Sequence, residues 1–396
     1  MDVIFTLLFL VVATYVLLTA LVKKHSFLNK KLLQYVFVYH LLFAVVYYVY
    51  ATYNPSDSKL YYDVTRLMDF NWMESLNTTN GIVHFIAYPF VRFLSLSYES
   101  VMLIFAWFGY VGFVYAYIFI RENIPMDIKV FKKYDLLTLL LFLPNMHFWT
   151  VSLGKGSVIF MGLMLFTYAV KVPKKRLPTL LLGGFLVYMV RPHVMLFVLV
   201  GVMGGLLLGK ERISGGQKFL IIVASLLFLA AASSSILAVA NLENSENVIE
   251  DFEEFADSRS TGLSKSAGSG VAMTNYPLPI KLFTFWFRPL FVDSPGALGI
   301  FSSIENLVYL LLFAKIMNKR FVRFIKQAPY MVKMAAITFL LTSFAMTFIM
   351  SNLGIIMRQK SMVMYFAFFV IYYFLAQEQY NRTYLLQQQK IEPSTS

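Results

Sequence analysis

The chain has 396 residues, of which 59% are hydrophobic and only 14% are charged. Soluble domains have about 45–50% apolar and about 25% charged residues, so this chain has too few polar side chains to cover a water-facing globule. The composition predicts an integral membrane protein and excludes a soluble enzyme, a nucleic-acid-binding module and a disordered protein. The net charge of +13 does not indicate a nucleic-acid partner, because membrane proteins concentrate Lys and Arg in cytoplasmic loops. With no cysteine, disulfides, thiolate metal sites and cysteine nucleophiles are excluded as well.

Apolar segments long enough to cross about 30 Å of hydrocarbon recur along the chain. About 11 transmembrane helices (10–12) are expected, so residues 1–377 form one polytopic all-α domain, followed by a polar cytoplasmic tail at 378–396. The sixth and seventh spans are short and meet at Arg191-Pro192-His193, which fits either a tight hairpin or one broken helix. The predicted spans cover residues 2–22, 32–53, 100–120, 135–153, 155–171, 177–190, 193–209, 218–240, 298–317, 331–351 and 360–377.

The basic residues predict the orientation of these spans. Lys23 and Lys24 follow the first span instead of preceding it, so the amino terminus is expected outside and the first span is not a cleaved signal peptide. With this threading the cytoplasmic segments hold 23 of the 34 Lys and Arg residues but only 6 of the 21 acidic residues. The carboxyl terminus is then cytoplasmic.

Two further apolar segments, 81–97 and 277–295, do not fit the alternation, because counting either as a crossing would place a basic loop outside. Each contains prolines and an arginine among aromatic residues. Both are predicted to be re-entrant or interfacial segments on the outer side. The longest outer loop, about 241–297, is acidic at first and then rich in Ser and Gly, so its middle is expected to be mobile.

Basic residues on the outer side oppose the insertion bias and are therefore candidates for function. Converging arginine and lysine side chains suit a multiply charged anion, and arginine grips phosphate oxygens in a two-point fork. The alternative is that single cations reach lipid headgroups or pair with acids of the outer side. The candidates for substrate binding are Arg92, Lys155, Arg191, Arg288, Arg358 and Lys360.

Lys155 and the Arg191–His193 turn have the most informative surroundings. Gly154 and Gly156 flank Lys155 and allow the backbone to approach a ligand, although the spacing is not that of a nucleotide-binding P-loop. Proline at 192 frees carbonyls that can line a cavity. Outer aromatic residues such as those at 148–149 and 285–287 suit the apolar faces of sugar rings.

A general base would activate an acceptor hydroxyl, and the catalytic candidates are His193, Asp63 and His147, in falling order. Asp57, Asp63 and Asp69 follow the second span, where such acids more often cap a helix or solvate a loop. Glu305 lies at membrane depth and needs a partner, and a nearby basic residue would serve. The spacing of histidines and carboxylates does not indicate a metal site, and we expect no cofactor.

Four motifs occur in the order LPNMHFWTVSLGKGSVIFMGL, VYMVRPHVMLF, FWFRPLF to IEN, and SNLGIIMRQKSMVMYF. Their order resembles that of bacterial polysaccharide polymerases of the O-antigen polymerase (Wzy) and EpsG type, over roughly residues 30–377. The resemblance implies a metal-independent glycosyltransferase at the outer face of the bacterial inner membrane, which joins polyprenyl-pyrophosphate-linked glycan units for surface polysaccharide. It also implies contact with membrane lipid and with other polysaccharide-assembly membrane proteins. Outward-facing arginines are thought to hold the pyrophosphate in such polymerases, and the matching residues are Arg191, Arg288 and Arg358.

Two other functions stay open. One is a glycosyltransferase that uses a polyprenyl-phosphate sugar, which would need an outer aspartate such as Asp57 or Asp63. The other is a non-enzymatic exporter or flippase for an anionic glycan, although transporters usually have internal repeats and ionisable groups near the midplane.

Overall fold

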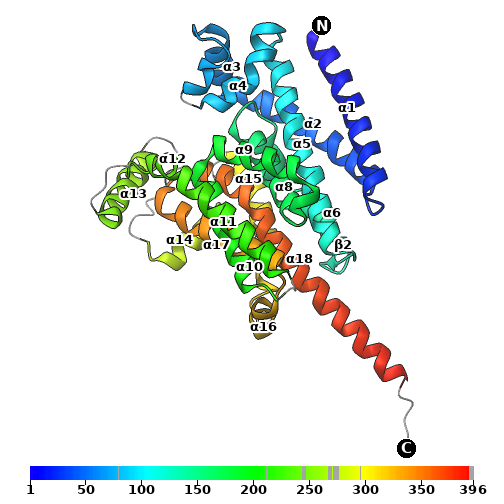
Figure 1. Cartoon of the computed structure of the whole chain (residues 1–396). Helices are drawn as coiled ribbons and strands as arrows, with labels where there is room; N and C mark the ends of the chain where they lie inside the picture. The colour runs from blue at the N-terminus through cyan, green and yellow to red at the C-terminus, as the bar shows by residue number, and fades with distance from the viewer. Residues whose placement is uncertain are drawn as a thin grey trace, which may run out of the picture.

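The structure, a computed structural model, describes residues 1–78, 80–210, 213–242, 247–265, 270, 276–294 and 296–391. Nearly all of them are helical; a two-stranded antiparallel hairpin joins β1 (Lys129–Val130) to β2 (Tyr134–Asp135). Helices satisfy their own backbone hydrogen bonds, which is what a chain of this apolarity needs in lipid. The chain is therefore an all-α membrane protein, as its composition predicts (Figure 1).

Within these ranges, five helices are long and apolar enough to cross a membrane, and a sixth candidate is a pair bent by 81°. The five are α1 (Asp2–Lys24), α2 (Lys30–Tyr53), α5 (Tyr98–Asn123), α17 (Tyr330–Ile349) and α18 (Leu353–Ile391). The bent pair is α15 (Gly296–Ala314) with α16 (Lys319–Gln327).

The other predicted spans are shorter apolar helices. The span expected at 135–153 is broken after Leu141, because Pro144 supplies no backbone donor and starts a new helix. The span expected at 218–240 likewise divides into two helices. The shorter elements are α6 (Leu136–Leu141), α7 (Pro144–Thr150), α8 (Lys155–Val170), α9 (Leu177–Val190), α10 (Pro192–Leu208), α11 (Gly215–Ala231) and α12 (Ser233–Ala238).

Helix ends that the charge pattern assigns to one side of the membrane lie together. At the end that carries the β-hairpin, His25 contacts the Tyr168 hydroxyl at 3.1 Å, and the Tyr330 hydroxyl donates to the Val170 carbonyl at 3.0 Å. At the opposite end, Asp2 accepts from the backbone N–H of Ser97 at 2.8 Å. We call these the hairpin end and the pocket end.

The contacts of α9 and α10 decide between the two arrangements that the sequence left open. Arg176, just before α9, donates to the Tyr168 carbonyl at 2.7 Å at the hairpin end. Leu208, the last residue of α10, accepts from Lys333 at that same end. The start of α9 and the end of α10 thus lie at the same end of the bundle. The two helices therefore form a tight hairpin that turns at Arg191.

The two segments predicted to be re-entrant or interfacial are helical, and the long loop after α12 contains a helix that the sequence did not predict. Residues 81–97 hold α4 (Gly81–Tyr88) and a π-helical turn, η2 (Pro89–Phe93), and α14 (Leu278–Phe287) and η4 (Phe291–Asp293) lie within 277–295. The acidic part of the long loop forms α13 (Val248–Lys265), which packs against α17, and the hydroxyls of Ser260 and Ser351 are hydrogen bonded. Residues 266–269 and 271–275 of the Ser/Gly-rich stretch lie outside the described residues.

The polar tail is also helical as far as the structure describes it. α18 has 39 residues, about 58 Å at 1.5 Å per residue, which is nearly twice the hydrocarbon thickness. Its carboxyl-terminal part leaves the bundle (Figure 1).

Close helix contacts in the bundle depend on glycine. Along α10, Gly201, Gly205 and Gly209 recur every four residues and face α17. A Cβ at Gly205 would lie 2.7 Å from the Tyr330 carbonyl oxygen and 2.9 Å from Cβ of Met334. Small residues at this spacing let two helix backbones approach in lipid, where the hydrophobic effect does not drive association.

Substituting Gly205→Ala should therefore destabilise the α10–α17 contact, by roughly 1–3 kcal/mol of overpacking. The matched control is Gly216→Ala in α11, where a new Cβ would meet no atom within 4 Å. Apparent unfolding temperatures in one detergent measure both effects. We expect a lower temperature for Gly205→Ala and no decrease for Gly216→Ala; equal temperatures would show that the glycine contact is not needed.

Candidate site: a cationic pocket at one end of the bundle

A small pocket lies at the pocket end, between the start of α8 and α3 (Asp57–Leu67), the first helix after α2. Lys155, Arg191 and Arg358 line it together with the carboxylate of Asp57. Tyr47, Tyr61 and Trp149 supply aromatic rings. The cavity volume is about 20 Å³, which is enough for an ordered water or a few ligand atoms.

Three helices begin at this pocket. Asp57 is the first residue of α3, Lys155 the first of α8, and Arg191 immediately precedes Pro192, the first of α10. Helix amino termini carry a partial positive charge and unpaired backbone N–H groups. Two of the three cations therefore sit where the backbone already favours an anion.

The turn before α8 places Lys155. A Cβ on Gly156 would lie 2.2 Å from the Trp149 carbonyl oxygen, so only glycine fits against the end of α7. The Ser157 hydroxyl donates to the carbonyls of Ser152 and Gly154, at 3.2 and 3.1 Å. A Cβ on Gly154 would be 3.2 Å from the Tyr61 ring, so α3 also packs closely on this turn. The two glycines flanking Lys155 serve helix packing, and that packing brings Lys155 to the pocket.

Arg191 is the single residue between α9 and α10. Its Nε atom is buried and has no hydrogen-bond partner in the described part of the chain, and the same holds for Nδ1 of His193. An unsatisfied buried donor costs roughly 1–3 kcal/mol. A ligand that accepts a hydrogen bond from the Arg191 Nε–H would remove this cost.

Arg358 and Asp57 join α18 to α3 through an ion pair of 2.7 Å. The side chains are 35% and 53% exposed, so the pair contributes less than about 1 kcal/mol and is readily exchanged. Burial raises the pKa of the neighbouring Tyr61 hydroxyl, and Asp57 raises it further. Tyr61 therefore keeps its proton at neutral pH and can act as a hydrogen-bond donor.

Three other predicted cations are held elsewhere. Arg288 is not among the residues that line the pocket; its guanidinium is paired with Asp293. Lys360 is fully buried and donates to the Arg288 carbonyl at 3.0 Å and to the side chain of Asn306. Arg92 donates to the carbonyls of Thr65, at 2.8 Å, and Met68, and so ties the π-helical turn to α3.

Lys360 belongs to a buried polar cluster that includes Glu305. The Glu305 carboxylate accepts from the backbone N–H of Asn145 at 2.6 Å and from the Tyr309 hydroxyl. Polar groups in the bundle interior need hydrogen-bond partners. In this cluster the partners come from α7, α14, α15 and α18, so the cluster joins these helices. Glu305 thus has hydrogen-bond partners, as its depth requires, but those that donate to it are a backbone N–H and a hydroxyl and not a basic side chain.

The structure separates the three candidate bases. His193 follows Arg191 by two residues but is not among the residues that line the pocket. Asp63 is exposed and lies on the opposite face of α3 from Asp57 and Tyr61. His147 has no exposed surface; it contacts His40 at 2.8 Å and stacks on Phe113 with ring centroids 4.0 Å apart.

The carboxylate that lines the pocket is Asp57, which the sequence analysis favoured as a helix cap. Asp57 and Tyr61 lie at i and i+4, so they share one face of α3. This spacing was visible in the sequence, but which face meets the bundle was not.

Comparisons with protein-family models, with curated proteins and with solved structures found no match to this chain.

Substituting Gly156→Ala should displace Lys155, because the new Cβ cannot be accommodated beside the Trp149 carbonyl. We expect a lower unfolding temperature in detergent and weaker binding of inorganic pyrophosphate, measured by calorimetry. Gly262→Ala, in an open position of α13, is the matched control. Unchanged stability and binding in Gly156→Ala would mean that the turn does not position Lys155.

Proposed function

We propose that this chain is a metal-independent glycosyltransferase that polymerises polyprenyl-pyrophosphate-linked oligosaccharide units at the outer face of the bacterial inner membrane. The observation that carries the proposal is the convergence of Lys155, Arg191 and Arg358 on one pocket with aromatic walls. These cations come from three distant parts of the chain. The resemblance to O-antigen polymerases and EpsG-type proteins supports the same function.

The charge of the pocket favours a lipid diphosphate as the bound group. Three cations and one carboxylate give a formal charge of +2, to which the starts of α8 and α10 add partial positive charge. A diphosphate leaving group carries complementary negative charge, and two arginines hold phosphate oxygens through forked hydrogen bonds. Tyr47, Tyr61 and Trp149 offer faces for sugar rings.

The Asp57–Arg358 ion pair supplies the base of the proposed mechanism. When a phosphate oxygen takes the place of the Asp57 carboxylate on Arg358, the carboxylate is released to accept the proton of an acceptor sugar hydroxyl. The acceptor oxygen then bonds to the anomeric carbon of the donor sugar, and the bond between that carbon and the diphosphate oxygen breaks. Lys155, Arg191 and Arg358 stabilise the charge that develops on the departing polyprenyl pyrophosphate. His193 is the second candidate base.

The proposed topology has eleven spans, with the amino terminus and the pocket outside and the carboxyl terminus in the cytoplasm. In this arrangement α6 and α7 together make one broken span, as do α11 and α12. α4 and α14 stay on the outer side as re-entrant or interfacial helices. The pocket then opens where an undecaprenyl-type chain can lie in the outer leaflet while its phosphates reach the cations.

Alanine at Lys155, Arg191 or Arg358 should reduce polymer formation about tenfold to hundredfold, because a charge-assisted contact is worth roughly 1.5–3 kcal/mol. Arg358→Lys should keep part of the activity, since it keeps the charge but loses the fork. The assay uses purified protein in nanodiscs with radiolabelled glycan-diphosphate lipid and reads product length.

The exposed Arg66→Ala, also on α3, is the control and should leave polymer length unchanged. Arg288→Ala should lower the unfolding temperature through loss of the Asp293 pair. Normal polymer from all three pocket variants, or relocation of the glycan without elongation, would contradict the proposal; the second result would favour a transporter.

The position of Asp57 also favours one alternative, a glycosyltransferase that uses a polyprenyl-monophosphate sugar and an outer aspartate. Supplying the same glycan on a monophosphate or a diphosphate lipid separates the two enzymes. We expect turnover of the diphosphate donor alone. Turnover of the monophosphate donor alone would assign the alternative.

A further inference from the structure

A second, larger pocket lies at the hairpin end, the end that the charge pattern assigns to the cytoplasm. Its cavity volume is about 350 Å³. Three elements enclose it: β1, the bent junction between α15 and α16, and the part of α18 that extends beyond the bundle. The proposed glycosyl transfer at the pocket end does not use it.

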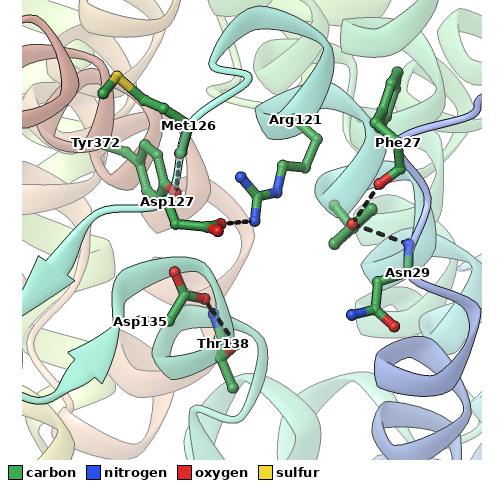
Figure 2. Close-up of polar contacts among 9 residues, drawn as sticks. Phe27, Asn29, Arg121, Met126, Asp127, Asp135, Thr138 and Tyr372 are labelled. Carbon is green, nitrogen blue, oxygen red and sulfur yellow. Dashed lines mark hydrogen bonds and ion pairs between the residues drawn. The ribbon is translucent and has the colours of Figure 1, made fainter. Parts of the chain in front are cut away.

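Hydrogen bonds hold the hairpin that forms one wall of this cytoplasmic pocket. Arg121 is paired with Asp127, and the Tyr372 hydroxyl of α18 donates to the Met126 carbonyl at 2.9 Å, as Figure 2 shows. At the other end of the hairpin, Asp135 accepts from the backbone N–H and the hydroxyl of Thr138, at 2.8 and 2.7 Å (Figure 2). The wall that presents Lys129 is thus fixed to α5, α6 and α18.

The pocket is strongly basic. Lys129, Lys315, Arg320 and Arg382 line it, and Glu378 is the one carboxylate among its lining residues. Glu378 pairs with Arg320 at 2.8 Å, which leaves a net formal charge of +3. Lysines and arginines that only direct membrane insertion do not need to line a common cavity. These four cations do line a common cavity, the cytoplasmic pocket.

The floor of the pocket is apolar and lies beside an interfacial helix. Phe374 of α18 contributes to the lining, and Phe321 and Phe324 of α16 pack on it with ring centroids 5.3 and 5.4 Å away. The remaining residues of α16 include four cations that are exposed: Lys319, Arg320, Arg323 and Lys326. A short helix with rings on one face and cations on the other lies in the plane of a membrane surface.

We propose that the cytoplasmic pocket binds a phosphate group at the inner membrane surface. The four cations that line the pocket are the groups that meet the phosphate, and the apolar floor suits the glycerol and first methylene groups of a lipid. A phosphate on an anionic lipid and a free phosphate share the chemistry that these cations recognise.

The test uses the full-length protein in nanodiscs of phosphatidylcholine with increasing phosphatidylglycerol, and native mass spectrometry counts the lipids that stay bound. We expect phosphatidylglycerol to be retained in preference to phosphatidylcholine. The double variant Lys129→Gln, Arg382→Gln should reduce this preference roughly 25-fold, since each cation near the surface contributes about a fivefold effect. Both side chains are exposed, so the variant should fold normally, and its unfolding temperature checks this.

Arg323→Gln is the matched control, because Arg323 lies on α16 but does not line the pocket. The second arm of the test adds millimolar inorganic phosphate to the protein in nanodiscs of pure phosphatidylcholine. Stabilisation there, lost in the double variant, would support the site with a soluble ligand. The proposal is overturned if neither phosphatidylglycerol nor phosphate is preferred, or if Arg323→Gln weakens binding as much as the double variant does.

Discussion

The pocket end depends on one physical constraint, the concentration of positive charge at helix amino termini. Lys155 starts α8 and Arg191 precedes α10, so each cation adds to the partial charge of a helix amino terminus instead of offsetting it. Arg358 brings a third charge from α18, and among the described residues Asp57 is the single carboxylate lining the pocket. Such an arrangement repels itself unless an anion joins it, and this is the physical reason for assigning a phosphate-bearing ligand.

The bundle keeps those charges together through close backbone contacts. A Cβ on Gly109 of α5 would lie 2.1 Å from the Thr150 carbonyl oxygen, so α5 touches the turn that leads to Lys155. A Cβ on Gly156 or Gly205 would likewise lie too close to a carbonyl oxygen, at 2.2 and 2.7 Å. Since neighbouring helices gain little from hydrophobic association in lipid, this packing decides which residues meet. The cations converge because the helices that carry them have little freedom to separate.

Much of the fold could be predicted, because the length of an apolar segment and the charge of a loop are properties of the local sequence. The bounds of α9 and the break at Arg191 follow from the short apolar runs around Pro192, whereas the choice between a hairpin and a broken helix came from the structure. The site was harder to predict, because convergence depends on which helix faces meet. Arg288, like Arg191, precedes a proline and was predicted on the outer side, yet it is paired with Asp293 and does not line the pocket. Asp63 and Asp57 differ only in the face of α3 that they occupy. His147 lies beside a predicted outer motif, but its ring packs inside the bundle against His40 and Phe113.

The most direct measurement is a cryo-electron microscopy structure of the protein with a short-chain polyprenyl diphosphate in nanodiscs. The account predicts density for the two phosphates between Lys155, Arg191 and Arg358, with the Asp57–Arg358 pair opened. Phosphate density at Arg288 or Arg92, or an intact Asp57–Arg358 pair with the lipid bound elsewhere, would contradict it.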